Sequence, residues 1–216
     1  IMYIYLNFKY QTIYMITTRD EIWLINDDRG TVKNQIGYFR PLASTPIIVY
    51  IWCLPYLSTI GFTEANSTSI SGFIANAHAT GALAALSFRP LNLMWEYQYS
   101  IVSRIDQGKG KTVLEWTMAS YQFFYGGFLV CTVNYVPNWL HTTTVTLFIM
   151  SFMFHSIMTL YFTSPKLLGK IELIIGVLSC ACLPFAKGIW FWGFECVGYT
   201  MMMLFTPTEI LCLPSV

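Results

Sequence analysis

The residue most able to do chemistry in this sequence is Glu195, an acid inside the apolar stretch AKGIWFWGFECVGYTMMMLFTPTEI, residues 186–210. A carboxylate is costly to place in lipid, so acids within membrane segments commonly mark proton or ion sites. Two hypotheses follow. Glu195 is either a functional membrane acid that exchanges protons, or a packing acid that hydrogen-bonds another helix. Its candidate partners are Lys187, a tyrosine or histidine of a neighbouring helix, and a lipid headgroup.

The chain has three histidines, and two of them, His141 and His155, lie fourteen residues apart. Fourteen residues are close to four helical turns, so both side chains point to the same side of one helix. This spacing also positions two haems in membrane b-type cytochromes, but two haems need four histidines. We therefore predict no haem on this chain. His141 is expected at a helix end, and His155 and His78 are expected to be interior polar or lipid-contacting side chains.

The other polar residues do not form a recognisable catalytic set. The six cysteines include no CxxC pair and lie in or beside apolar stretches, as packing residues do. Glu115 and Glu172 begin expected helices, where a negative charge favours the helix dipole, and we assign them no chemistry. Trp95, Trp190 and Trp192 suit an aromatic belt at the membrane interface, and the last two are candidate lipid contacts. We predict no catalytic residue, no metal and no cofactor ligated by this chain.

The composition places these residues in a membrane. Only 11% of the residues are charged and 55% are hydrophobic, whereas soluble domains carry about 25% charged residues. The stretch 116–165 has no charged residue and exceeds the roughly 20 apolar residues of one span. The predicted fold is an all-α, polytopic transmembrane bundle of about six helices, at 44–62, 70–90, 112–135, 141–163, 170–185 and 189–206. The count falls to five if the last two helices are one bent unit.

Residues 1–43 are expected to form a membrane-surface segment, and residues 44–216 the transmembrane helical domain. Pro55 is expected to kink the first helix or to end it early. Six spans place eleven of the twelve basic residues on the side of the termini and leave only Lys187 opposite. This asymmetry predicts that both termini face the cytoplasm or the mitochondrial matrix. A net charge of +1 gives no case for binding nucleic acid.

Small residues suggest tight packing against neighbours. Helix two carries several glycines and alanines, and helix three carries Gly126 and Gly127. Such faces let helices approach closely, so we expect the chain to work inside a larger membrane assembly.

The segment IWFWGFECV resembles the last helix of cytochrome c oxidase subunit III, whose pattern runs W-Y-W-H-F-x-D-V. The match includes Trp190, Trp192 and Phe194, while Glu195 supplies an acid one place before the family aspartate. Upstream, FMFHSIM resembles the family's G-F-H-G-L-H at Phe154 and His155. The resemblance implies a non-catalytic subunit of the mitochondrial inner membrane that stabilises the redox subunit of complex IV and holds phospholipid. Haem and copper would then belong to partner subunits of this respiratory electron-transport complex.

A second resemblance is to polytopic membrane proteins that remodel GPI-anchor lipids. PYLSTIGF, with Pro55, Tyr56, Ser58 and Gly61, is similar to that family's lumenal P-Y-x-S-x-x-G. Histidines in the second and fourth helices and an acid in the last helix are also similar. This resemblance implies a lipid-processing or regulatory protein of the endoplasmic reticulum or Golgi, with a glycosylation sequon at Asn66.

The favoured interpretation is the oxidase-like subunit, with other membrane subunits and phospholipids as partners. The alternatives are the GPI-anchor remodelling family and an accessory subunit with only a scaffolding role.

Overall fold

The structure is a computed structural model that describes the backbone of residues 7–8, 11–12, 30–65, 67–104 and 109–211. Side chains are described for residues 43–65, 67–95, 110–206 and 208. The described elements are the paired strands β1 (Asn7–Phe8) and β2 (Gln11–Thr12), the helices α2 (Gly30–Thr59), α3 (Ile70–Phe73), α4 (Ala77–Arg104), α5 (Lys109–Val130), α6 (Asn138–Phe162) and α7 (Leu167–Cys182), the 3₁₀ turn η1 (Leu183–Phe185), and α8 (Ile189–Leu211).

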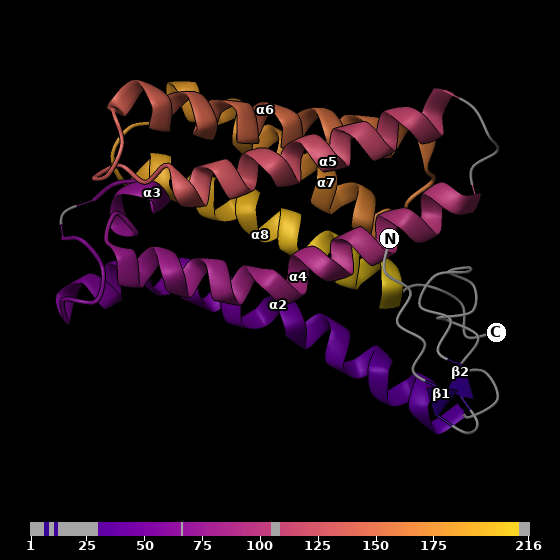
Figure 1. Ribbon diagram of the computed structural model, residues 1–216. Coiled ribbons are helices and arrows are strands. Elements are labelled where there is room, and N and C mark those ends of the chain that lie inside the picture. The colour runs from indigo at the N-terminus through magenta and orange to yellow at the C-terminus, as the bar shows by residue number, and fades with distance from the viewer. Residues whose placement is uncertain (1–6, 9–10, 13–29, 66, 105–108, 212–216) are drawn as a thin grey trace.

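Six long helices form a closed bundle. Each packs against its neighbour in the order α2, α4, α5, α6, α7, α8 and back to α2, and α4 also touches α8. Figure 1 shows α5 and α6 on one side, α2 and α4 on the other, and α8 between them. The connections 60–76, 131–137 and 183–188 gather at the end where α3 lies (Figure 1). The predicted helical fold is therefore confirmed for the described residues from Gly30 onward, and the short pair β1–β2 precedes it.

The first helix is longer than predicted. α2 begins at Gly30 rather than at residue 44, so the expected boundary between the surface segment and the helical domain falls inside a continuous helix. Of the two alternatives predicted at Pro55, a kink or an early end, the early end was wrong, because α2 continues to Thr59. A proline removes one helical N–H and leaves the carbonyl four residues earlier without its usual donor. That carbonyl belongs to Ile51, and the thiol of Cys196 lies 3.7 Å from it.

The second predicted helix, 70–90, is two helices. The short α3 ends at Phe73, and α4 starts at Ala77, where the side chain of Asn76 accepts a hydrogen bond from the N–H of Ala79 at 2.8 Å. An asparagine in this position caps a new helix, which explains the break. The sequence analysis missed this cap because apolar residues continue through it.

The last two helices are separate, as the six-helix count requires. η1 follows α7, and Gly188, at a φ of +57°, completes the turn before α8. α7 and α8 then pack against each other along a seam of two glycines. A Cβ added to Gly176 would lie 3.3 Å from the Cβ of Met201, and one added to Gly198 would lie 3.2 Å from the Sγ of Cys180. Small residues at these positions let the two helices approach closely.

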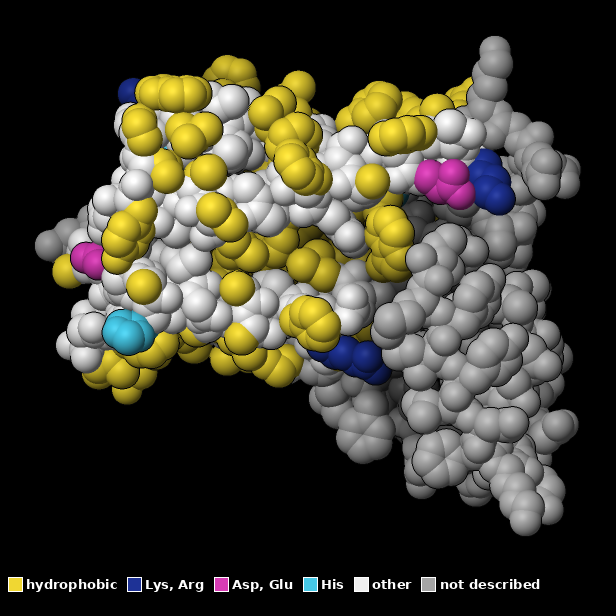
Figure 2. Space-filling view, in the orientation of Figure 1, with side chains coloured by type: hydrophobic (Ala, Val, Ile, Leu, Met, Phe, Trp, Pro, Cys, Tyr) yellow, Lys and Arg dark blue, Asp and Glu magenta, His cyan; other side chains and the backbone are white. Residues whose placement is uncertain are grey.

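The surface of the bundle is apolar, and so is its core. α6 and the segment from α7 through η1, Leu167–Phe185, are long and apolar enough to cross a membrane, and only 22% and 33% of their spans are buried. Neither is a core helix, which would be mostly buried. Figure 2 shows hydrophobic side chains spread over one face of the bundle, with few charged groups, most of which lie toward its ends. The structure thus indicates a membrane protein.

Candidate functional site

Glu195 lies in the second turn of α8 and faces the protein. Its Oε2 accepts a hydrogen bond of 2.6 Å from the main-chain N–H of Ile70, the first residue of α3. The predicted partners were side chains and lipid headgroups, but the described partner is a backbone amide from 125 positions earlier in the chain. No sequence pattern signals such a contact, because every residue except proline offers the same N–H.

The segment that Glu195 holds is the connection 60–76 between α2 and α4, which the structure describes at residues 60–65 and 67–76. Its two ends are tied together by hydrogen bonds from the N–H of Glu64 to the carbonyl of Phe73 (2.9 Å) and from Asn76 Nδ2 to the carbonyl of Phe62 (3.2 Å). The side chains of Ile70, Phe73 and Ile74 are buried. The connection is therefore a folded cap on this end of the bundle, and Glu195 fastens it to α8.

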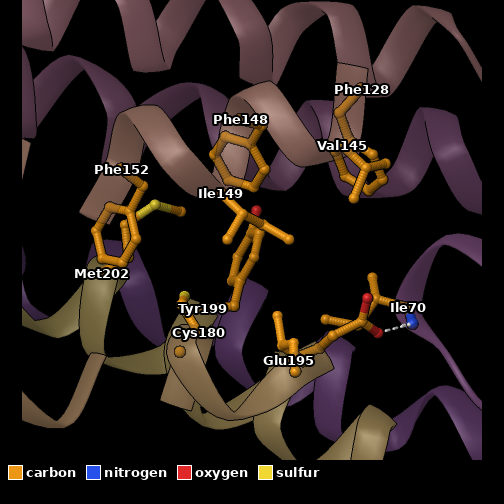
Figure 3. A pocket seen from close by; sticks show the side chains of 12 residues that line it. Ile70, Phe128, Val145, Phe148, Ile149, Phe152, Cys180, Glu195, Tyr199 and Met202 are labelled. Atoms are coloured by element: carbon orange, nitrogen blue, oxygen red, sulfur yellow. Dashed lines mark hydrogen bonds between the residues drawn. The ribbon is translucent and has the colours of Figure 1, made fainter. Parts of the chain in front are cut away.

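A cavity of about 50 Å³ lies beside Glu195 in the bundle interior. It is walled by apolar side chains of α5, α6 and α8, with Cys180 from α7 and Ile70 from the connection. Figure 3 shows Glu195 and Ile70 at one end of this cavity, Tyr199 near its centre, and Phe152 and Met202 at the other end. A water needs roughly 10–15 Å³ by this measure and two or more polar partners, so the cavity has room for a few waters beside the carboxylate.

Tyr199 connects this cavity to a cluster of three buried hydroxyl groups. Its OH is 2.5 Å from the OH of Tyr125 in α5, which also hydrogen-bonds the Oγ of Ser87 in α4. Ser87 Oγ lies 2.5 Å from the carbonyl of Leu83. Since a carbonyl only accepts, Ser87 donates to Leu83, and the phenols donate in turn toward Ser87. The hydroxyl cluster ties three helices together in the middle of the bundle.

His155 lies deeper along α6 and is buried, as expected for an interior polar residue. Its Nδ1 is 2.8 Å from the Oγ1 of Thr117 in α5, and its Nε2 is 3.5 Å from the Oγ1 of Thr159. It borders a second, smaller cavity of about 10 Å³ together with Ser156 and Thr206, which is room for about one water.

Glu172 is a buried acid that the sequence analysis left without a role. Its side chain is 6% exposed, and its Oε1 accepts a hydrogen bond of 2.7 Å from Thr208 Oγ1 in α8. The signal was present in the sequence. Glu172 shares one face of α7 with Gly169, Leu173 and Gly176, the spacing of a face that packs against another helix.

The other predicted site residues lie apart from this region. His78 is exposed at the start of α4, and Trp190 is exposed at the start of α8. Trp192 is half-buried and packs edge-on against Trp52, with ring centroids 5.6 Å apart. His141 lies in the first turn of α6, at a helix end as predicted, and its Nδ1 donates to the carbonyl of Cys131 at 2.6 Å. Among the described residues no group of three His, Cys, Asp or Glu side chains is placed to hold a metal.

No protein-family model matches this chain, and no curated protein or solved structure matches it either.

Proposed function

We propose that this chain is a six-span integral membrane protein that handles lipid and has no redox centre of its own. The observation that carries the proposal is the distribution of apolar side chains. Large hydrophobic residues are exposed along most of the bundle, including Val49 on α2, Phe88 on α4, Phe123 on α5, Phe154 on α6 and Leu178 on α7. In water such a surface would aggregate, whereas lipid tails would cover it. α8, at the centre, holds Glu195 away from that surface.

The geometry favours the GPI-anchor remodelling class over the oxidase-like class. In the P-Y-x-S-x-x-G segment, the carbonyl of Ser58 accepts a hydrogen bond from the N–H of Gly61 at 3.2 Å. Gly61 has a φ of +75°, which glycine adopts most easily. The motif thus forms the turn that starts the connection 60–76. The acid of the last helix, another shared feature, holds the same connection through Ile70.

The oxidase-like subunit, which the sequence alone favoured, becomes the second candidate. The two segments that carry this resemblance lie on α6 and α8, and both helices line the cavity beside Glu195. Under this proposal the chain stabilises a neighbouring redox subunit of complex IV in the mitochondrial inner membrane. Haem and copper are then held by the partner subunits, and phospholipid by this chain.

Glycosylation and location separate the two classes. Asn66, which lies outside the described residues, starts the sequon NST. If the chain enters the secretory pathway with the connection 60–76 on the lumenal side, glycosidase treatment will lower its apparent mass, and Asn66→Gln will abolish the shift. If it is an oxidase subunit, it will stay unglycosylated and co-purify with haem- and copper-containing subunits.

Lipid handling is tested separately by native mass spectrometry of the protein in detergent. We expect retained phospholipid or glycolipid adducts. A chain released from detergent without any bound lipid, and stable as a homogeneous monomer, would contradict the proposal.

A further inference from the structure

Three titratable side chains lie one after another in space along the interior of the bundle. Glu195 borders the larger cavity, His155 borders the smaller one, and Glu172 lies beyond it on α7. Glu195 and Thr208, the partner of Glu172, are thirteen residues apart on α8, which is about 20 Å along a helix. The hydrocarbon core of a bilayer is about 30 Å thick. The two acids therefore lie near opposite ends of the bundle, and His155 lies between them.

The two cavities meet at one pair of side chains. Phe152 of α6 and Met202 of α8 line both cavities, and both side chains are buried. The ring of Phe152 also faces α7, since a Cβ added to Gly176 would lie 3.5 Å from its Cζ. α6, α7 and α8 thus close the interior between the two cavities, with Glu195 on one side of the closure and His155 on the other.

The hydrogen bonds of His155 leave one ring nitrogen as a proton acceptor. Thr117 Oγ1 lies 2.8 Å from Nδ1 and 3.2 Å from the carbonyl of Leu114. When the hydroxyl donates to that carbonyl, Nδ1–H donates to Thr117 and the lone pair is on Nε2. Beside this imidazole, the small cavity is also lined by the hydroxyl-bearing Ser156, Thr159 and Thr206. One ordered water there would have enough partners to be held.

The geometry points to a proton pathway through the bundle, from Glu195 by way of His155 to Glu172, closed at Phe152 and Met202. Protons are the ligand because the path joins two acids through an imidazole, and its narrow part, where hydroxyl groups surround His155, has room for single waters only. In the larger cavity, whose walls are otherwise apolar, the polar groups are the Glu195 carboxylate and the Tyr199 hydroxyl. Acid and histidine chains of this kind are the usual proton relays of membrane proteins. Cys180 and Tyr199 are the other titratable groups on the larger cavity.

Each step moves one proton and leaves every group as it began. Glu195 takes a proton at the end of the bundle capped by the connection 60–76 and gives it to water in the larger cavity. When Phe152 and Met202 separate, that water passes the proton to Nε2 of His155. The imidazolium returns it to water in the smaller cavity, that water passes it to Glu172, and Glu172 releases it at the end of the bundle where α7 begins.

The test is proton flux into vesicles that contain the purified full chain. Phosphatidylcholine–phosphatidylglycerol vesicles hold a pH-sensitive dye, and valinomycin with a potassium gradient drives protons across the membrane. We expect Phe152→Ala, which opens the constriction, to raise the flux several-fold over the wild type. Adding Glu195→Gln to Phe152→Ala should return it to the level of empty vesicles. Phe123→Ala, on the exposed face of α5, is the matched control and should leave the flux unchanged.

Two results would overturn the pathway. One is a Phe152→Ala flux no greater than that of Phe123→Ala. The other is a flux that survives Glu195→Gln. If Phe152→Ala does not fold, Met202→Ala opens the same constriction from the other helix. The wild type gives a further test, because the infrared carboxyl band that Glu195→Gln removes should shift in heavy water. A band that does not shift shows that no water reaches Glu195, and the proposal then fails.

Discussion

Replacing Glu195 by leucine tests whether the carboxylate fastens the connection 60–76 to α8. The N–H of Ile70 is in a buried residue, and its described acceptor is Glu195 Oε2 at 2.6 Å. Leucine removes that acceptor, and a buried donor left without a partner costs about 1–3 kcal/mol. Glu195→Gln keeps a side-chain oxygen at the same reach, so we expect it to lose less than about 1 kcal/mol.

Hydrogen–deuterium exchange of the peptide that covers residues 67–75 measures this loss locally. If opening of the connection limits exchange, about 1–3 kcal/mol corresponds to amides that exchange roughly 5- to 150-fold faster, since about 1.4 kcal/mol is a factor of ten. The effect should be confined to this end of the bundle. Peptides from α6 should exchange at the wild-type rate.

The matched control is Glu115→Leu, which removes an exposed acid from α5. It should leave the connection unchanged. Equal exchange of residues 67–75 in the wild type and in Glu195→Leu would refute the reasoning. So would a similar acceleration in Glu115→Leu, because the loss would then not depend on the contact with Ile70.

Three further outcomes are expected. Gly176→Ala should lower the thermal unfolding midpoint in detergent, because overpacking the α7–α8 seam costs about 1–3 kcal/mol, whereas Gly193→Ala, with open space around it, should not. Tyr199→Phe should also lower the midpoint, since it removes one hydroxyl of the buried cluster and costs about 1–3 kcal/mol; an unchanged midpoint would show that the cluster does not stabilise the bundle. Cysteines introduced at Asn66 and Gln107, which lie outside the described residues, should react with a membrane-impermeant reagent from opposite sides, and labelling from the same side would contradict six spans.

Long helices could be located from the sequence because their signal is local. The charge-free stretch and its flanking charges gave 112–135 and 141–163, close to α5 and α6. The turn between the last two helices was also predictable, from Pro184 and Gly188. Helix ends were less accurate, as at Pro55, because a proline interrupts one hydrogen bond and whether the helix continues depends on what lies beside it.

Glu195 and Glu172 show which features of the candidate site could not be predicted from the sequence. Glu195 was singled out because an acid in an apolar stretch is visible in the sequence. Its partner was not, because a backbone N–H has no distinguishing residue type. Glu172 was read as a helix-start acid, although its spacing with two glycines places it on the packed face of α7.

The sequence by itself determined that this chain is mostly helical, where the helices after residue 109 lie, and that one acid stands in an apolar segment. These properties depend on composition and on spacing within one element. Only the tertiary structure decided that Ile70 meets Glu195, that two cavities share Phe152 and Met202, and that His155 and Glu172 face the same interior. Such contacts join residues on different helices, and which helix faces come together is set by packing of the whole bundle.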